Sequence, residues 1–173
     1  MRKKAIAIVM ITMLPITGCG SSGSDTDSGE KEVASDFDPE TNQTVTYGDI
    51  SFEVPENWTV KDNEIFTEDE DGALAVTVED GTYDMDQKEN QEQAVEICAE
   101  SYEDIEEVSR ETISVLDDIP AFSYVFTGED STISTLWFSL KDHFYMLAFE
   151  ELGSSSTSYT KEFESIIDSL KEV

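Results

Sequence analysis

The sequence predicts an α+β fold: an α/β/α sandwich with a central, mainly antiparallel sheet of about six to seven strands and two main helices. Three observations lead to this prediction. Several short segments alternate apolar and polar residues, which is typical of strands. Two later segments are apolar on both faces, which indicates a sheet covered on both sides. Two further segments repeat apolar residues every three or four positions, the spacing of amphipathic helices.

Four short alternating segments are expected to form the first strands: residues 44–47, 50–54, 65–67 and 73–78. Pro55 ends the second of them, because proline has no amide to donate to a ladder. The last two are expected to form a hairpin in which Asp71-Gly72 supplies the positive φ angles of the turn.

A first helix is predicted over residues 90–108. Its apolar stripe consists of Ala94, Cys98, Ser101, Tyr102, Ile105 and Val108. Asp86 with Glu89, or Asn90 with Gln93, has the spacing of a cap at its start.

Four more strands are expected at residues 113–116, 121–127, 133–140 and 144–150. The last two strands are expected to carry apolar side chains on both faces. In the strand at residues 133–140, one face has Ile133 and Trp137 and the other has Leu136, Phe138 and Leu140. In the strand at residues 144–150, one face has Phe144, Met146 and Ala148 and the other has Tyr145, Leu147 and Phe149. A final amphipathic helix is predicted over residues 158–171. The short turns make the sheet mainly antiparallel, with a helix on each face or both helices on one.

Residues 1–18 have the layout of a lipoprotein signal peptide. A basic start is followed by an apolar run at residues 5–14 that is too short to span a bilayer. The run closes on Ile16-Thr17-Gly18-Cys19, which resembles a bacterial lipobox. Cleavage between Gly18 and Cys19 would leave Cys19 as the new N-terminus, carrying a diacylglycerol on its thiol. We therefore expect a lipid-anchored protein at the extracytoplasmic face of the cell membrane.

The remaining chain divides into two parts. Residues 19–43 contain the lipidated cysteine and a flexible, acidic tether rich in Gly and Ser. Residues 44–173 form one folded domain of a common size.

The charge of the chain limits its partners. Ten Lys and Arg residues stand against 40 Asp and Glu residues, a net charge of −30, and loss of the three basic residues of the leader makes the mature chain about −33. Such a surface repels phosphate backbones and anionic headgroups, which excludes nucleic-acid binding. The membrane contact is therefore expected to be the diacylglyceryl group on Cys19.

Two residues decide whether the sequence supports nucleophilic catalysis. His143 is the only histidine and is expected to be an exposed residue of a tight turn. Cys98 lies on the predicted apolar stripe of the first helix and is expected to be a small buried side chain. Neither predicts a catalytic residue.

Two groups of residues are candidates for binding. Glu68, Asp69, Glu70 and Asp71 place four carboxylates beside a turn, with Asp80, Asp84 and Asp86 expected nearby, so Ca²⁺ is a possible ligand although the loop does not fit an EF-hand register. The alternative is a solvated acidic hairpin. The aromatic residues Trp58, Tyr124, Trp137 and Tyr145 would line a groove for sugars or peptides, or else belong to the sheet core.

The order of elements resembles the PsbP-like family. The resemblance lies in ISFEVPENW at residues 50–58, in Ile119-Pro120-Ala121 and in FESIIDSL at residues 163–170. Many members have Gly where this chain has Asp118. The resemblance covers residues 45–171 and implies an α/β/α sandwich. It also implies a non-catalytic binding or assembly role, and it transfers no catalytic residue to this chain.

From these features we expect a membrane-anchored, non-enzymatic module that binds or helps to assemble an envelope protein or a small ligand. A cation-dependent binding module centred on residues 68–71 is the second hypothesis, and a hydrolase is the third.

Overall fold

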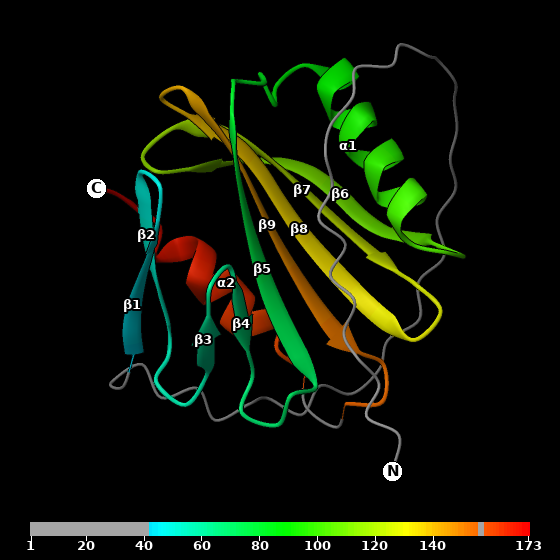
Figure 1. Ribbon diagram of the computed structural model, residues 1–173. Helices are drawn as coiled ribbons and strands as arrows, with labels where there is room; N and C mark the ends of the chain where they lie inside the picture. The colour runs from blue at the N-terminus through cyan, green and yellow to red at the C-terminus, as the bar shows by residue number, and fades with distance from the viewer. Residues whose placement is uncertain (1–41, 156–157) are drawn as a thin grey trace.

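The computed structural model describes residues 42–155 and 158–173, which form a seven-stranded sheet, a three-stranded sheet and two helices (Figure 1). The large sheet has the order β3 (Thr59–Lys61), β4 (Glu64–Phe66), β5 (Gly72–Asp80), β9 (His143–Leu152), β8 (Ser131–Leu140), β7 (Ile119–Thr127), β6 (Glu106–Val115). Every neighbouring pair is antiparallel. The predicted α+β fold with a central antiparallel sheet is confirmed.

The small sheet was not predicted. It consists of β1 (Asn42–Tyr47), β2 (Ile50–Pro55) and β10 (Lys171–Glu172), with β2 in the middle. The start and the end of the described chain meet here, because Lys171 and Glu172 pair with Ser51 and Ile50.

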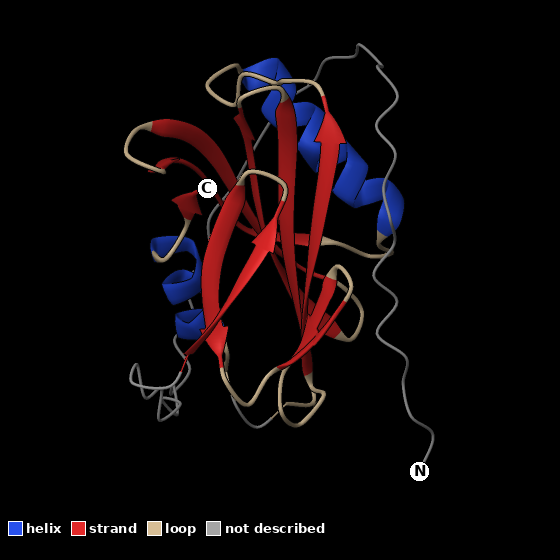
Figure 2. Ribbon diagram, turned by 60° about the vertical axis from the view of Figure 1, so that its left-hand side comes forward, coloured by secondary structure: helices blue, strands red, loops and turns tan. Residues whose placement is uncertain are grey.

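The two helices cover opposite faces of the large sheet (Figure 2). α1 (Lys88–Ser101) buries Ala94 and Cys98 against one face. α2 (Thr160–Asp168) packs on the other face together with the small sheet. The Ser169 hydroxyl joins these two, because it accepts a 2.8 Å hydrogen bond from the Glu53 amide of β2.

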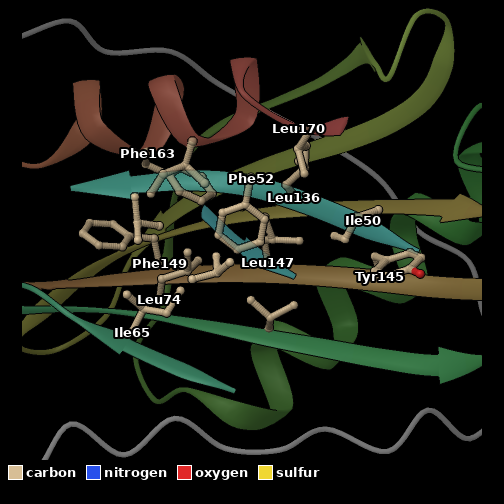
Figure 3. Close-up of a cluster of buried hydrophobic side chains, with 14 of the residues drawn as sticks. Ile50, Phe52, Ile65, Leu74, Leu136, Tyr145, Leu147, Phe149, Phe163 and Leu170 are labelled. Carbon is tan, nitrogen blue, oxygen red and sulfur yellow. The ribbon is translucent and has the colours of Figure 1, made fainter. Parts of the chain in front are cut away.

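The two faces of β8 and β9 divide as the sequence predicts. Ile133, Trp137, Phe144, Met146 and Ala148 pack under α1. Leu136, Phe138, Leu140, Tyr145, Leu147 and Phe149 pack under the small sheet and α2. Figure 3 shows this second cluster, in which Phe163 and Leu170 from the α2 side face side chains of β2 and β9.

The predicted first helix is wrong at both ends. α1 stops at Ser101 because Tyr102 is extended and Asp104 adopts a φ of 52°, which a right-handed helix does not contain. The chain then enters β6 seven residues before the strand predicted at residue 113. Neither proposed cap forms: Gln87 is the N-cap residue and makes no capping side-chain bond. Asp84 instead accepts bonds from the Asp86 amide and the Asn90 side chain.

The turn between β4 and β5 also differs from the prediction. The positive φ lies at Glu70 (61°), and Gly72 is the first residue of β5. Gly72 is needed for space, because a Cβ there would lie 2.9 Å from Thr67 Cγ2 and 3.0 Å from Phe149 Cζ. The final helix is shorter than predicted: it begins at Thr160 and ends at Asp168, and Lys171 belongs to β10.

Candidate functional site

The open edge of the large sheet carries the longest run of exposed strand residues in the described chain. β6 has one strand partner, β7, and its residues 106–112 are all exposed. The other edge strand, β3, has three residues and lies beside the small sheet, where Gln43 Nε2 donates to the Trp58 carbonyl at 2.7 Å and Tyr47 donates to the Asp62 carbonyl at 2.8 Å. The two edges therefore differ in length and in cover.

Carboxylates dominate the surface around β6. Residues 84–118, which include α1 and β6, contain thirteen acidic and two basic residues. We call the exposed side chains of α1 and β6 the α1–β6 surface. Glu96 and Glu100 are exposed on α1, and Glu106 and Glu111 are exposed on the face of β6 that points away from α1.

Arg110 holds β6 against α1. Its guanidinium bonds the Glu107 carboxylate and reaches Glu92 Oε1 on α1 at 3.2 Å, while its Cζ lies 5.8 Å from the centre of the Tyr124 ring. The hydrogen bond with Glu107 raises the pKa of Arg110 above its already high ordinary value. A second link runs from Gln91 Nε2 to Thr112 Oγ1, 2.9 Å apart.

A bulge interrupts β6 at Val108. The register with β7 shifts between Glu107 and Ser109, and Val108 is 60% exposed. Bulges at sheet edges turn side chains away from the regular ladder. Here the bulge leaves a large apolar side chain in solvent, between Glu107 and Ser109.

Sequence reasoning did not find this surface. It assigned residues 106–108 to a helix, because Glu-rich segments favour helices and the stripe of apolar residues continued to Val108. The signal that was present is the density of acidic residues between Asp84 and Asp118.

His143 is a half-buried strand residue, where we expected an exposed turn residue. Its Nδ1 lies 3.0 Å from Asp49 Oδ2, and Lys141 Nζ lies 3.1 Å from Asp49 Oδ1 and 3.1 Å from Glu172 Oε1. Hydrogen bonds from Lys141 and then from His143 lower the pKa of Asp49. Because Asp49, Lys141 and Glu172 come from three distant segments, this cluster fastens the ends of the two sheets together.

The acidic hairpin is tied into the fold through Asp69. Its Oδ1 accepts bonds from Thr67 Oγ1 (2.8 Å) and the Asp71 amide (3.1 Å), and its Oδ2 accepts one from the Tyr159 hydroxyl (2.7 Å). Burial raises the pKa of Asp69, but these bonds outweigh it and lower the pKa overall. Glu68 accepts a bond from Asn57.

The acidic residues Asp80, Asp84 and Asp86, which were expected near the hairpin, lie away from it. Asp80 ends β5, about 27 Å from its first residue at a strand rise of about 3.4 Å per residue, and Asp84 and Asp86 follow Asp80. Within residues 42–155 and 158–173, no group of three or more His, Cys, Asp or Glu side chains is arranged to hold a metal ion. The expected proximity of Asp80, Asp84 and Asp86 is wrong.

The four candidate aromatic residues are all buried and do not meet. Tyr124 and Trp137 lie under α1, and Trp58 and Tyr145 lie on the other side of the sheet. They are core residues, the alternative that the sequence also allowed. Trp58 packs on Phe149 and Tyr159, with ring centres 5.8 and 5.9 Å apart.

Cys98 lies on the buried side of α1, against the large sheet, as predicted. Burial raises the pKa of its thiol to about 12, so the thiolate that would act as a nucleophile is scarce at neutral pH. Gly18 and Cys19 lie outside the described residues. Neither of the helices in residues 42–155 and 158–173 is long and apolar enough to cross a membrane.

Comparison with known proteins identifies a family and a fold. The family described as PsbP-like protein matches residues 4–171. The solution structure of cyanobacterial PsbP (CyanoP) from Synechocystis sp. PCC 6803 is similar, with a TM-score of 0.57 at 10% identity over 81% of this chain and 97% of that one. A crystal structure from Bacteroides thetaiotaomicron VPI-5482 has a TM-score of 0.45 at 13% identity, over 72% of this chain and 45% of that one. No curated protein matches the sequence.

Proposed function

This chain belongs to the PsbP-like protein family, and from that premise we propose that it is a lipid-anchored module that binds or helps to assemble a partner protein at the extracytoplasmic face of the membrane. The observation that carries the proposal is a sequence resembling a lipobox that ends at Cys19, in a chain with a PsbP-like domain in which His143 contacts Asp49 and Cys98 is buried.

The leader supports the location. A basic start, a short apolar run and small residues before Cys19 are the features that a lipoprotein signal requires. The family match begins at residue 4 and therefore includes residues 4–18 of this leader. A single acyl chain without a basic patch binds membranes weakly, whereas a diacylglyceryl group supplies two acyl chains. This acidic chain is expected to depend on that group.

The chemistry of the fold supports a non-catalytic role. His143 contacts Asp49 and approaches Asp80, and its ring does not hydrogen-bond a hydroxyl or thiol in the described chain. Cys98 is buried in the α1 core. A triad needs a nucleophile within hydrogen-bond reach of its base, and these two residues belong to different parts of the molecule.

Replacement of Cys19 tests the anchor. The full chain is expressed in a bacterial host with an alkyne-tagged fatty acid, and membranes are separated from soluble protein. The wild-type chain should be labelled and sediment with membranes. Cys19→Ala should be unlabelled, and should be either released or retained uncleaved with its leader. Cys98→Ala is the matched control, because it removes the other cysteine and should behave as wild type. Equal labelling of wild type and Cys19→Ala would overturn the anchor.

A further inference from the structure

We propose that the open edge of β6 is a docking site for an extended, basic segment of a partner protein, which adds to the large sheet as a further strand. This inference rests on the proposed function, because it specifies the kind of partner that the anchored domain binds. Strand addition uses main-chain hydrogen bonds for affinity and side-chain contacts for specificity.

The first argument is the geometry of the edge. β6 has ten residues, so at about 3.4 Å per residue it offers roughly 30 Å of strand whose outer side has no strand partner in the described chain. Native proteins usually shorten or cover such edges, because an exposed edge pairs with other chains. β3 at the opposite edge is short and covered, whereas β6 is long and uncovered, and its protection consists of acidic side chains and a bulge, which leave it open to a short strand of opposite charge.

The second argument is the sign of the charge. Glu106 and Glu111 are exposed on β6, where their partners Thr127 and Ser123 place them on the face of the sheet that points away from α1, and Glu96 and Glu100 are exposed on α1 on the other face. Carboxylates therefore flank the edge from both faces. The one arginine of this surface, Arg110, is already bonded to Glu107 and Glu92. An incoming strand that carries Lys or Arg would meet carboxylates, whereas an acidic strand would be repelled.

The same charges exclude two other occupants. A second copy of this chain would bring its own acidic β6 edge, and like charges directly opposite each other destabilise strand pairs. The tether of the chain is also unsuitable, because residues 20–41 contain seven acidic residues and one basic residue, Lys31. The surface therefore disfavours self-pairing and favours a basic chain.

The third argument is the bulge. Val108 is 60% exposed and lies between acidic residues of the same strand. An apolar side chain of the incoming segment can cover it, which predicts a segment in which basic and apolar residues alternate. The bulge also limits regular pairing with a long, flat strand, so a short segment is expected.

Hydrogen exchange of the full chain, purified in a neutral detergent, tests the inference. The probe is an eight-residue peptide of alternating Lys and Val. Its first control has Glu in place of Lys. Its second control keeps the lysines but has alternate backbone amides methylated, so that it cannot complete a ladder. Mass spectrometry of proteolytic fragments locates the protected amides.

The Lys-Val peptide should slow exchange within residues 106–115, and neither control should do so. Glu106→Lys with Glu111→Lys should weaken binding by about tenfold or more. The pair Glu56→Lys with Glu164→Lys makes the same change in charge at exposed positions near the small sheet and on α2, and should change binding by about twofold or less.

Several outcomes would overturn the inference. Equal protection by the methylated peptide would show attraction of charge without strand pairing. Protection outside β6, no protection, or dimerisation through β6 would also contradict it. The proposed function is read separately, from the Cys19→Ala fractionation. If the anchored protein captures a partner but the amides of β6 are not protected from exchange, the proposed function stands and this inference is wrong.

Discussion

Glu150 is a carboxylate placed among apolar side chains. It lies on β9 on the face that α1 covers, it is 9% exposed, and its Oε2 has no hydrogen-bond partner in the described chain. Burial raises the pKa of Glu150, and a hydrogen bond from Ser131 opposes this rise. The ionised form is therefore less favourable in the folded chain than in the unfolded one.

Glu150→Gln should stabilise the protein at neutral pH. As pH rises above the ordinary pKa of glutamate, the unfolded chain releases this proton and the folded chain retains it, so stability falls through the window up to the raised pKa. The neutral amide avoids that loss, and we expect a gain of about 1 kcal/mol at neutral pH.

Thermal melting across pH checks this expectation. The Glu150→Gln and wild-type curves should separate at neutral pH and converge below the ordinary glutamate pKa. Glu164→Gln, at an exposed position of α2, should follow wild type throughout. Curves for Glu150→Gln that stay parallel to wild type would contradict the account of Glu150.

Trp58 tests the packing on the other face of the sheet. It is 5% exposed and stacks on Phe149. Trp58→Ala should lower the free energy of unfolding by about 3–5 kcal/mol, measured by denaturant titration. Trp58→Phe should lower the free energy of unfolding by less, because phenylalanine keeps an aromatic ring against Phe149. Unchanged stability with lost partner binding would make Trp58 a surface contact.

Individual core residues were predictable where alternation is strict. In β8 and β9 each side chain lies on the face that a period of two assigns to it. Glu150 was predicted to end a strand, and its burial was not predicted. Tyr102 packs its ring on Phe126 after α1 has ended, and burial, followed by the nearby charge of Glu150, raises the pKa of Tyr102. Local sequence does not show that these segments come together.

The turn between β6 and β7 is conformationally strained. Leu116, Asp117 and Asp118 have φ angles of 49°, 62° and 127°. Side chains with a Cβ disfavour such angles, and each costs of the order of 1 kcal/mol or more. Many PsbP-like proteins have Gly at the position of Asp118, and the positive φ angle at this position gives the physical reason.

Asp118→Gly should therefore stabilise the protein by about 1 kcal/mol, measured as the shift in denaturation midpoint. Asp142→Gly is the matched control in the β8–β9 turn, where Asp142 is not among the residues with positive φ. It should be neutral or destabilising, because glycine adds entropy to the unfolded chain. A loss of stability in Asp118→Gly would contradict the strain.

Helices and strands were predicted best where their pattern is long. The end of α1 was missed because residues 100–107 are rich in good helix formers, and only pairing with β7 makes residues 106–108 a strand. β3 and β10 were missed because three and two residues are too few to show a period. Their pairing is set by tertiary contacts.

The whole molecule combines an acidic domain with a leader that predicts lipid attachment. Both features belong to composition and to a local motif, so the sequence alone was sufficient to propose them. The α1–β6 surface is different. It exists because α1 and the edge strand lie side by side, joined by Glu92, Arg110, Gln91 and Thr112, and that contact needs the fold.

The central claim is that the anchored domain binds a partner protein at the membrane. The most direct test is in-cell crosslinking of the full-length chain followed by mass spectrometry, with Cys19→Ala as the control. We predict that the wild-type chain captures one abundant envelope protein and that Cys19→Ala captures much less of it. Capture that does not exceed background, or that is equal for the wild type and for Cys19→Ala released from the membrane, would contradict the claim.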